Sequence, residues 1–561
     1  MSFFKKIVGK SDSPKGTPKG TPKGSPTSGN TPKETSPKGT PKSRKEKKKI
    51  EKERKLRESN TDQNEIDEID FGKEAENDDA PQDKKSLWSK ISGLVGKDPM
   101  SLVSLPVYFF EPLTVLESQA EPLRFYDLLE EAISKQDPVE RMLYITAFNI
   151  SIFSSYVRTA KPFNPLLGET FEYIPKQGNY RTFCEQVSHH PPIGLCETQA
   201  KNFNLQQESW IATKFWGTSL DVFSLGQNHL YLPTHNNEHY TWKIPSAICH
   251  NLLIGKMWIE HHGDLIVKNH TSGESAQVKF YKSGIFESTT KKVAGEIKDS
   301  TGKTRYLING RWCEYINAVE LNDNGDKVRE FIIWRAKPDP MEKENKWKHG
   351  EFLQSLNELT PEMEEILPPT DSRLRLDRRL LQNGDNKNAN REKNKIEERQ
   401  REIRKQREAK GVTWLPRYFT KVEDATFGYR WVFNSTYWNE RAERIESLKE
   451  KSGNKAPEIP QLSSSHVVQR LNPATTNINN NNNIILDGDR EKFVKTTTTT
   501  TTTTTYHTPS VEESGEGETV LTEHIKTPIS NIYTYTHSPT IKSEKSTVTP
   551  PALDQVGQGA L

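Results

Sequence analysis

Two adjacent histidines, His189 and His190, precede two prolines in the stretch EQVSHHPPIG, which runs from Glu185 to Gly194. Neighbouring residues of a regular strand point to opposite faces, so two imidazoles could not reach one ligand from such a strand. Pro191 restricts His190 to an extended or turn geometry and ends the strand. We therefore expect both rings to be presented from one rigid corner. Paired imidazoles suit a phosphate or a metal ion.

Two other chemistries are weaker candidates. The stretch HNNEH, His235 to His239, matches the H-x-x-E-H pattern of one metalloprotease class, which requires a helix. Here the paired asparagines stand between the alternating stretches NHLYLP and YTWKIP and predict a turn. None of the four cysteines has an arginine six residues later, as the anion cradle of a cysteine phosphatase requires. We expect no metal site, no cofactor and no enzymatic activity.

Two further segments supply donors that suit phosphate. The stretch AKPFNPLLGETF holds Lys161 and Asn164 in a turn fixed by proline. In the charged stretch NREKNKIEERQREIRKQREAKG, the residues Lys393, Glu397 and Arg401 are spaced i, i+4 and i+8, so they line one face of a helix. A solvated helix with ion pairs has the same pattern. Spacing alone leaves both interpretations open.

The elements that must position these residues change in type along the chain. Helical patterns run from Arg124 to Thr159. After Phe163, alternation with period two, broken by Gly, Asn and Pro, predicts many short strands without helices between them. This pattern favours a large antiparallel sheet or barrel that could hold one small ligand. Helical character returns from Phe352.

Composition divides the chain of 561 residues, of which 32% are hydrophobic. Roughly residues 86–445 carry nearly all the Trp, Phe and Leu, and we expect one folded domain over residues 100–445. Residues 1–85 and 446–561 are rich in Ser, Thr, Pro, Lys and Asn and predict disordered tails. Residues 86–99 have helical spacing of apolar residues between lysines. This short segment is either an amphipathic membrane anchor or a helix packed on the domain.

The charge is also uneven. Residues 1–57 contain 18 Lys and Arg against 5 Asp and Glu, a net charge of +13, and an acidic stretch follows. Such an arm suits an anionic membrane or a nucleic acid, or is a solvated tail. No CxxC pair, signal peptide or membrane-spanning run is found. We expect reduced thiols and a cytosolic protein that associates peripherally with intracellular membranes.

EQVSHHPP resembles, over all eight residues, the signature octapeptide of the oxysterol-binding protein family. Other blocks resemble the family in the same order: KPFNPLLGETFE, FWGTSLDV, LIGKMWIEHHG, GRWCEYI, LPPTDSRLRLDRRLL and EERQREIR. The resemblance covers roughly residues 95 to 445. It implies a mainly β fold with helices, in which a near-complete antiparallel β-barrel encloses a lipid tunnel. The resemblance further implies a lid and helices at the N-terminal side of the barrel and a helical region at the C-terminal side.

The resemblance also implies ligands and site residues. Family members bind phosphatidylinositol 4-phosphate at the tunnel mouth and a sterol or another lipid in the tunnel. By resemblance, His189 and His190 would hold the 4-phosphate, and Lys161 and Asn164 would contact the inositol phosphates. The remaining residues of the clamp would be Lys393, Glu397 and Arg401. The lid would lie in Met100 to Phe110 and use Met100, Leu102, Val103, Leu105, Phe109 and Phe110.

The second lipid and the mode of action stay open. Where sterol-binding relatives carry glutamine this chain has Ser155, so phosphatidylserine or another phospholipid is an alternative to a sterol. Residues 1–85 are too polar and repetitive for a pleckstrin-homology domain, which leaves targeting to the basic arm, residues 86–99 and the phosphoinositide. We expect an exchanger that uses anionic membrane surfaces and no nucleic acid. The alternative is a lipid sensor or scaffold without net transport.

Overall fold

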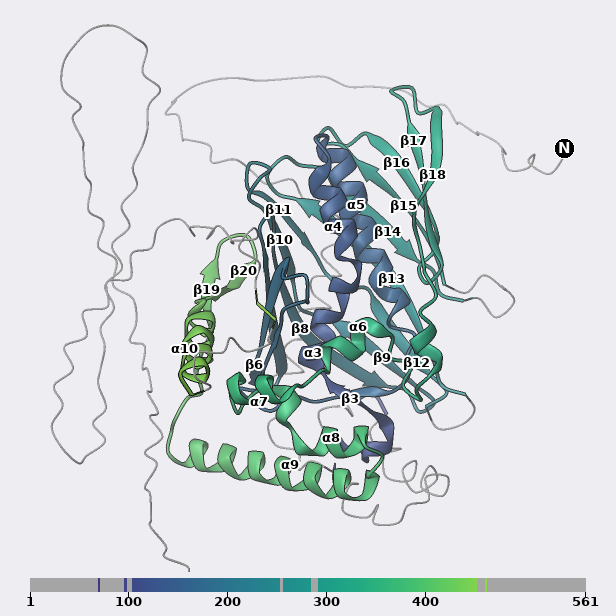
Figure 1. Cartoon of the computed structure of the whole chain (residues 1–561). Helices are drawn as coiled ribbons and strands as arrows, with labels where there is room; N and C mark the ends of the chain where they lie inside the picture. The colour runs from purple at the N-terminus through teal and green to yellow at the C-terminus, as the bar shows by residue number, and fades with distance from the viewer. Residues whose placement is uncertain are drawn as a thin grey trace, which may run out of the picture. The chain divides into compact units, whose positions relative to one another are not determined.

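The computed structural model describes residues 69–70, 95–97, 103–252, 256–283, 291–451 and 460–461. All belong to one compact unit, Lys55–Leu561. Figure 1 shows its helices and strands. The helices are α3 (Val115–Ala120), α4 (Tyr126–Ser134), α5 (Pro138–Ser151), α6 (Glu351–Leu356), α7 (Pro361–Ile366), α8 (Leu376–Gln382), α9 (Asn386–Ala409) and α10 (Thr436–Lys451), with short 3₁₀ turns such as η2 (Val107–Phe109) and η6 (Ser372–Leu374).

Fourteen of the strands form one sheet in the order β18-β17-β16-β15-β14-β13-β11-β10-β8-β7-β6-β5, with β9 and β12 attached beside β8 and β13. The bounds of these strands are β5 (Thr170–Tyr173), β6 (Tyr180–His189), β7 (Pro192–Ala200), β8 (Asn204–Phe215), β9 (Ser219–Ser224), β10 (Asn228–Leu232), β11 (Glu238–Trp242), β12 (Ser246–His250), β13 (Trp258–Asn269), β14 (Ser275–Phe280), β15 (Lys292–Lys298), β16 (Thr304–Arg311), β17 (Tyr315–Leu321) and β18 (Lys327–Arg335). Every pairing within this sheet is antiparallel. The large antiparallel sheet predicted from period-two alternation is confirmed.

Three small pairs complete the strands: β1 (Ile69–Asp70) with β2 (Val103–Ser104), β3 (Phe110–Thr114) with β4 (Lys161–Phe163), and β19 (Phe419–Asp424) with β20 (Gly428–Phe433). Helix α5 packs across β13, β14, β15, β17 and β18, and α3 packs on β6 and β7. Figure 1 shows α4 and α5 lying side by side over one face of the sheet. The helices therefore bury one face of the sheet in the main core.

Strands β6 and β7 are buried on both faces, and the buried residues of β6 include the polar Thr182, Glu185 and Gln186. Cys184 and Cys196 face the main core on the α3 side. Phe183 and Leu195 point the other way, into a second core closed by β19, β20 and α10. The chain after α9 forms this covering hairpin, where the sequence predicted only helical character. The strand pair that ends in the two histidines is thus fixed from both sides.

A buried ionic network joins the segment around α8 to the N-terminal helices. The guanidinium of Arg378 donates to Glu117 Oε1 at 2.7 Å, to Pro112 O at 2.9 Å and to Ser372 O at 2.9 Å, and it also bonds Asn357. Both Arg378 and Glu117 have fully buried side chains. A buried ion pair is favourable only when the hydrogen bonds of both groups are satisfied, and here they are. These hydrogen bonds therefore fix α8 beside β3.

The predicted helices between Arg124 and Thr159 correspond to α4 and α5, and those after Phe352 to α6 through α10. Of the segment 86–99 only Val95, Gly96 and Lys97 are described, as a turn in which Gly96 N donates to Phe215 O at 2.7 Å. The rest of that segment and nearly all of both predicted tails lie outside the described residues. Within the described part, no helix has the length and apolar character needed to cross a bilayer.

Candidate functional site

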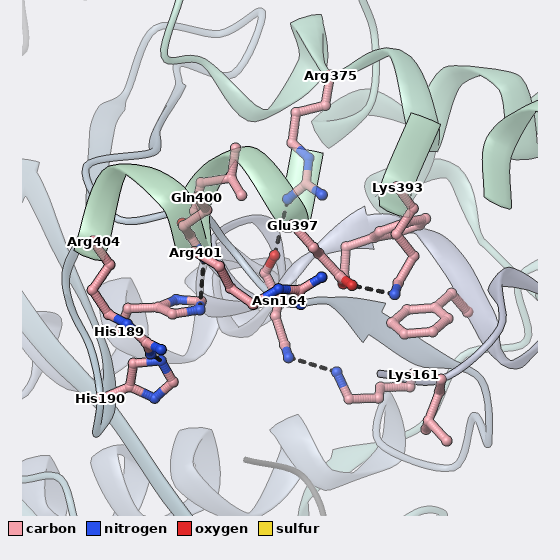
Figure 2. A pocket seen from close by; sticks show the side chains of 14 residues that line it. Lys161, Asn164, His189, His190, Arg375, Lys393, Glu397, Gln400, Arg401 and Arg404 are labelled. Carbon is pink, nitrogen blue, oxygen red and sulfur yellow. Dashed lines mark hydrogen bonds and ion pairs between the residues drawn. The ribbon is translucent and has the colours of Figure 1, made fainter. Parts of the chain in front are cut away.

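One pocket collects all seven predicted ligand-binding residues (Figure 2). We call it the cationic pocket. It lies where the β6–β7 corner, the segment of β4 and the face of α9 meet. Its lining residues are Leu105, Phe110, Lys161, Phe163, Asn164, Leu166, His189, His190, Arg375, Lys393, Glu397, Gln400, Arg401 and Arg404. The structure therefore brings together residues that are more than 200 positions apart in the sequence.

The two histidines occupy the corner between β6 and β7. His189 ends β6 and pairs with Pro192, while His190 and Pro191, joined by a cis peptide bond, form the turn. The register of β6 against β7 shifts between Gln186 and Ser188, and a bulge of this kind redirects the side chains that follow it. The two imidazole rings lie 4.8 Å apart between centroids. Both rings line the same pocket, as the proline argument predicts.

Helix α9 contributes the opposite wall because one of its faces turns toward the pocket. Asp385 caps its first turn by accepting from Asn388 N at 3.1 Å, and Gly411, with φ +64°, follows its end. On the pocket face, the ammonium of Lys393 lies 2.6 Å from Glu397 Oε1, and only 3% of the Lys393 side chain is exposed. The lysine of this pair is therefore buried against the domain and Glu397 is partly buried, unlike the surface pairs of a solvated helix.

The next turn of α9 contacts the histidines directly. Leu167 N donates to Gln400 Oε1 at 2.8 Å, which orients the amide so that Gln400 Nε2 donates to His189 Nε2 at 2.7 Å. Arg404 Nη1 donates to His190 Nε2 at 2.7 Å. Both Nε2 atoms are acceptors, so both imidazoles are neutral and carry their proton on Nδ1.

The electrostatics of the histidines agree with this assignment. Burial, followed by the charges of His190 and Arg404, lowers the pKa of His189 to about 3. Burial and then Arg404 lower the pKa of His190 to about 4. The corner of the two histidines therefore disfavours additional positive charge. An anion placed there would reverse the balance and favour protonation.

Lys161 and Asn164 face these groups from β4 and the turn after it. Lys161 Nζ donates to Asn164 Oδ1 at 2.6 Å and lies 5.0 Å from the centre of the Phe110 ring. Arg375 Nη1 holds the turn by donating to the backbone oxygen of Asn164 at 2.9 Å. Burial, followed by the ammonium of Lys393, lowers the pKa of Lys161 to about 7. Lys161 is therefore a cation that changes charge near neutral pH.

Sequence reasoning missed Arg375, Gln400 and Arg404. Gln400 and Arg404 continue the face of Lys393 and Glu397 by one more turn of α9, so extending the same periodicity could have found them. Arg375 has no such signal. It reaches the pocket because its guanidinium is fixed by Glu169 at 2.9 Å and Asp377 at 2.6 Å.

The first residue of the octapeptide has a supporting role. Glu185 accepts from the backbone N–H groups of Arg417 at 2.8 Å and Tyr418 at 3.0 Å. This carboxylate ties β6 to the chain that follows α9. Nearby, the Trp414 ring lies against Gly168, whose φ of +79° favours glycine and where a Cβ atom would come within 2.8 Å of the ring. These contacts set the position of α9 over the pocket.

The structure describes only part of the predicted lid. Met100 and Leu102 lie outside the described residues, and of Val103 only the backbone is described, in β2. Leu105 lines the cationic pocket, Phe109 packs on the cluster formed by Phe110, Phe163, Leu381 and Ala389, and Phe110 begins β3. The base of the segment is thus anchored beside the pocket, and its role as a lid stays a prediction.

The HNNEH stretch forms the predicted turn between β10 and β11. Asn236 and Asn237 have φ values of 52° and 53°, as in the tight turns of hairpins. Glu238 accepts from Arg141 at 2.6 Å. In the described residues no group of three or more His, Cys, Asp or Glu is arranged to hold a metal ion. The stretch therefore lacks the helical geometry of the metalloprotease pattern.

Comparisons with known proteins agree on one family. A family model described as oxysterol-binding protein matches residues 86–442. Oxysterol-binding protein 11 of Dictyostelium discoideum is 56% identical over 392 residues, covering 69% of this chain and 68% of that protein. Oxysterol-binding protein-related protein 3 of Homo sapiens is 38% identical over 355 residues, covering 63% of this chain. Those residues make up 39% of the human protein, so the chain spans about two fifths of its length.

Solved structures support the same grouping. The crystal structure of the Osh1 ORD domain in complex with cholesterol has a TM-score of 0.60 and 34% identity, and covers 70% of this chain and 97% of that one. The complex of the same domain with ergosterol gives the same values. The Osh3 ORD in complex with PI(4)P from Saccharomyces cerevisiae has a TM-score of 0.54 and 29% identity, and covers 67% and 95% of the two chains.

Proposed function

The chain belongs to the oxysterol-binding protein family, and on that premise we propose that it exchanges lipids between membranes. It binds phosphatidylinositol 4-phosphate and a second lipid, a sterol or another phospholipid, in mutually exclusive fashion. It has no catalytic role. It works in the cytosol and associates peripherally with intracellular membranes. The observation that carries this proposal is the convergence of cationic and donor side chains from three distant segments in the cationic pocket.

The positive charge of the cationic pocket complements the negative charge of a phosphoinositide headgroup. Besides Arg375, which is paired with Glu169 and Asp377, the pocket has four cationic side chains and the Glu397 carboxylate. The four are Lys161, Lys393, Arg401 and Arg404. A headgroup with a phosphate monoester and a phosphodiester carries an opposing charge of similar size. In our proposal the imidazoles hold the 4-phosphate, Lys161 and Asn164 contact the inositol phosphates, and Lys393, Glu397 and Arg401 complete the clamp.

Binding requires a rearrangement of side chains. The lining side chains leave a volume of about 50 Å³ between them, and Gln400 and Arg404 already hydrogen-bond the two imidazole Nε2 atoms that the phosphate would contact. Gln400 and Arg404 therefore leave the imidazoles when the phosphate enters. The phosphate then accepts from both rings, which take up protons because an adjacent anion favours the charged form. Arg404 stays close enough to bind a phosphate oxygen.

The sheet supplies the site for the rest of the lipid. We propose that it curves into a near-complete barrel whose apolar inner face, with α5 packed against it, encloses the tunnel. The segment from Met100 to Phe110 would close this tunnel over the lipid and exclude water during transit. The sterol and PI(4)P complexes of related domains support this arrangement.

The experiment that tests the function is lipid exchange by the full chain. Lipids that copurify from eukaryotic cells are identified by mass spectrometry, and vesicles containing phosphatidylinositol 4-phosphate are then added. We expect one-for-one displacement of the copurified lipid and transfer of both lipids between vesicle populations. Phosphoinositide binding without displacement or transfer would instead favour a sensor or scaffold.

The affinity of the pocket for the headgroup is expected to fall as the pH rises above about 7. The Lys161 pKa of about 7 means that this side chain loses its charge there, while a bound phosphate raises the pKa and restores the charge. Binding at higher pH therefore takes up a proton. Above neutrality this proton adds to those taken up by the two imidazoles, so we expect the dissociation constant to rise with pH more steeply than below neutrality, by a further factor of roughly ten per pH unit.

Calorimetry with a short-chain phosphoinositide, in buffers with different ionisation enthalpies, measures the affinity and the proton uptake together. The matched variant is Lys161→Arg, whose guanidinium stays charged throughout this range. Its profile is expected to be flatter above pH 7. Equal slopes for the wild-type and variant proteins would show that Lys161 is not the titrating group.

A further inference from the structure

A second and larger groove lies between β5 with the turn that follows it, the start of α4, and the helices α6, α7 and α8. Its free volume of about 1110 Å³ exceeds the range of about 300–1,000 Å³ that is typical of sites for small molecules. It shares no lining residue with the cationic pocket. Exchange of lipids through the cationic pocket therefore gives this groove no role.

Aromatic side chains line the groove, so we call it the tyrosine groove. The rings of Tyr126 and Tyr180 have their centres 5.0 Å apart, and those of Tyr173 and Tyr180 lie 6.2 Å apart. Phe352 of α6 meets the Tyr173 ring edge-on at 5.7 Å. Grooves lined by aromatic rings bind extended segments of chain that contain proline. The lining thus suits a peptide segment.

A residue of the C-terminal part of the chain already lies in the tyrosine groove. Pro460 is one of its lining residues, although it comes nine residues after α10 ends at Lys451. Arg441 Nη2 donates to Pro460 O at 2.8 Å. Because Arg441 belongs to the first half of α10, Pro460 lies back alongside this helix and against the domain.

The contact that holds Pro460 is built on buried charges. Arg441 and Glu172 are 5% and 3% exposed, and Arg441 Nε donates to Glu172 Oε2 at 2.8 Å. Tyr437 OH donates to the same carboxylate oxygen at 2.6 Å. Glu172 therefore fixes the guanidinium, and the carbonyl of Pro460 satisfies one of its remaining donors. The start of the C-terminal tail is thus bound by the interior of the domain.

Charge indicates which segment fills the rest of the groove. The lining has four Lys and Arg against five Asp and Glu, so it is nearly neutral and does not complement residues 1–57 with their net charge of +13. Residues 462–471, LSSSHVVQRL, begin two positions after Pro460 and contain one arginine and no acidic residue. Four of these ten side chains are apolar and suit an aromatic lining: Leu462, Val467, Val468 and Leu471.

We propose that residues 462–471 bind in the tyrosine groove of their own chain, with their apolar side chains on the tyrosine rings. The anchored Pro460 keeps this segment beside the groove at a high effective concentration, so little further entropy is lost on binding. The folded domain then extends beyond residue 442, where the match to the family model ends. The rest of the tail leaves the domain from the groove and not from the end of α10.

The test is hydrogen exchange, followed by mass spectrometry, on the full chain and two variants. The first variant combines Leu462→Ser, Val467→Ser and Val468→Ser. The matched control changes three apolar residues further along the same tail, Ile484→Ser, Ile485→Ser and Leu486→Ser. Each protein is measured at two concentrations that differ about tenfold, because binding within one chain does not depend on concentration.

We expect amides of residues 462–471 to exchange at least tenfold more slowly in the wild type than in the first variant. The groove segments 174–180 and 351–358 should lose protection in that variant, while the control matches the wild type. Equal exchange of residues 462–471 in the wild type and the first variant would overturn the proposal. Protection that appears only at the higher concentration would assign the groove to a second copy and would also overturn it.

Discussion

Replacing both His189 and His190 with alanine is expected to abolish extraction of phosphatidylinositol 4-phosphate from vesicles. The two rings sit 4.8 Å apart at one corner and line the same pocket. Each hydrogen bond to a charged phosphate contributes about 1.5–3 kcal/mol, so losing two reduces the affinity by at least about 100-fold. The measurement is the fraction of labelled phosphoinositide removed from vesicles at a fixed protein concentration.

Two controls make this result interpretable. His235→Ala removes a histidine from the β10–β11 turn, outside the pocket, and is expected to extract lipid like the wild type. The thermal unfolding transition of the double variant should stay close to that of the wild type, because the two rings lie at a turn. Retained extraction by a folded double variant would refute the assignment of these histidines to the phosphate.

Replacing Arg378 with alanine is expected to lower the free energy of unfolding by about 3–5 kcal/mol. The substitution leaves the buried carboxylate of Glu117 without its cation and leaves Pro112 O and Ser372 O without a donor. An uncompensated charge inside a protein is costly, whereas the intact pair satisfies its hydrogen bonds. Urea unfolding followed by far-UV circular dichroism measures the change.

The matched control is the ion pair between Lys135 and Glu131, spaced i, i+4 on the surface. Lys135→Ala is expected to change the free energy of unfolding by no more than about 0.5 kcal/mol, because water screens both charges. A loss below about 1 kcal/mol for Arg378→Ala would mean that water or a rearranged side chain replaces the guanidinium.

Local patterns predicted the elements that carry the site. The alternation from Tyr180 to His189 indicated a strand, and the two prolines indicated its end. The i, i+4, i+8 spacing in residues 386–409 indicated one face of a helix, and the family resemblance implied that this face binds the ligand. Both features depend on neighbours in the sequence, which is why periodicity and turn chemistry are sufficient to find them.

Other features depend on contacts between distant segments. Arg375 lines the pocket because Glu169 and Asp377 fix its guanidinium, and nothing in its local sequence distinguishes it from Arg373 or Arg378. The hairpin of β19 and β20 is favoured by the apolar outer face of β6 and β7, which appears only once the sheet has formed. A single sequence does not encode such pairings in its local pattern.

The second core, which lies between β6, β7 and the elements β19, β20 and α10, limits how this gene can be shortened. The Phe183 ring lies tilted against the Tyr437 ring with centres 4.1 Å apart, and Tyr418 meets the Phe183 ring edge-on. A premature stop codon after α9 would remove these partners and expose an aromatic surface on the strands that present the histidines. Such a product would retain every residue of the cationic pocket and still be prone to aggregation and degradation, so truncating alleles in this region should behave as complete losses of function.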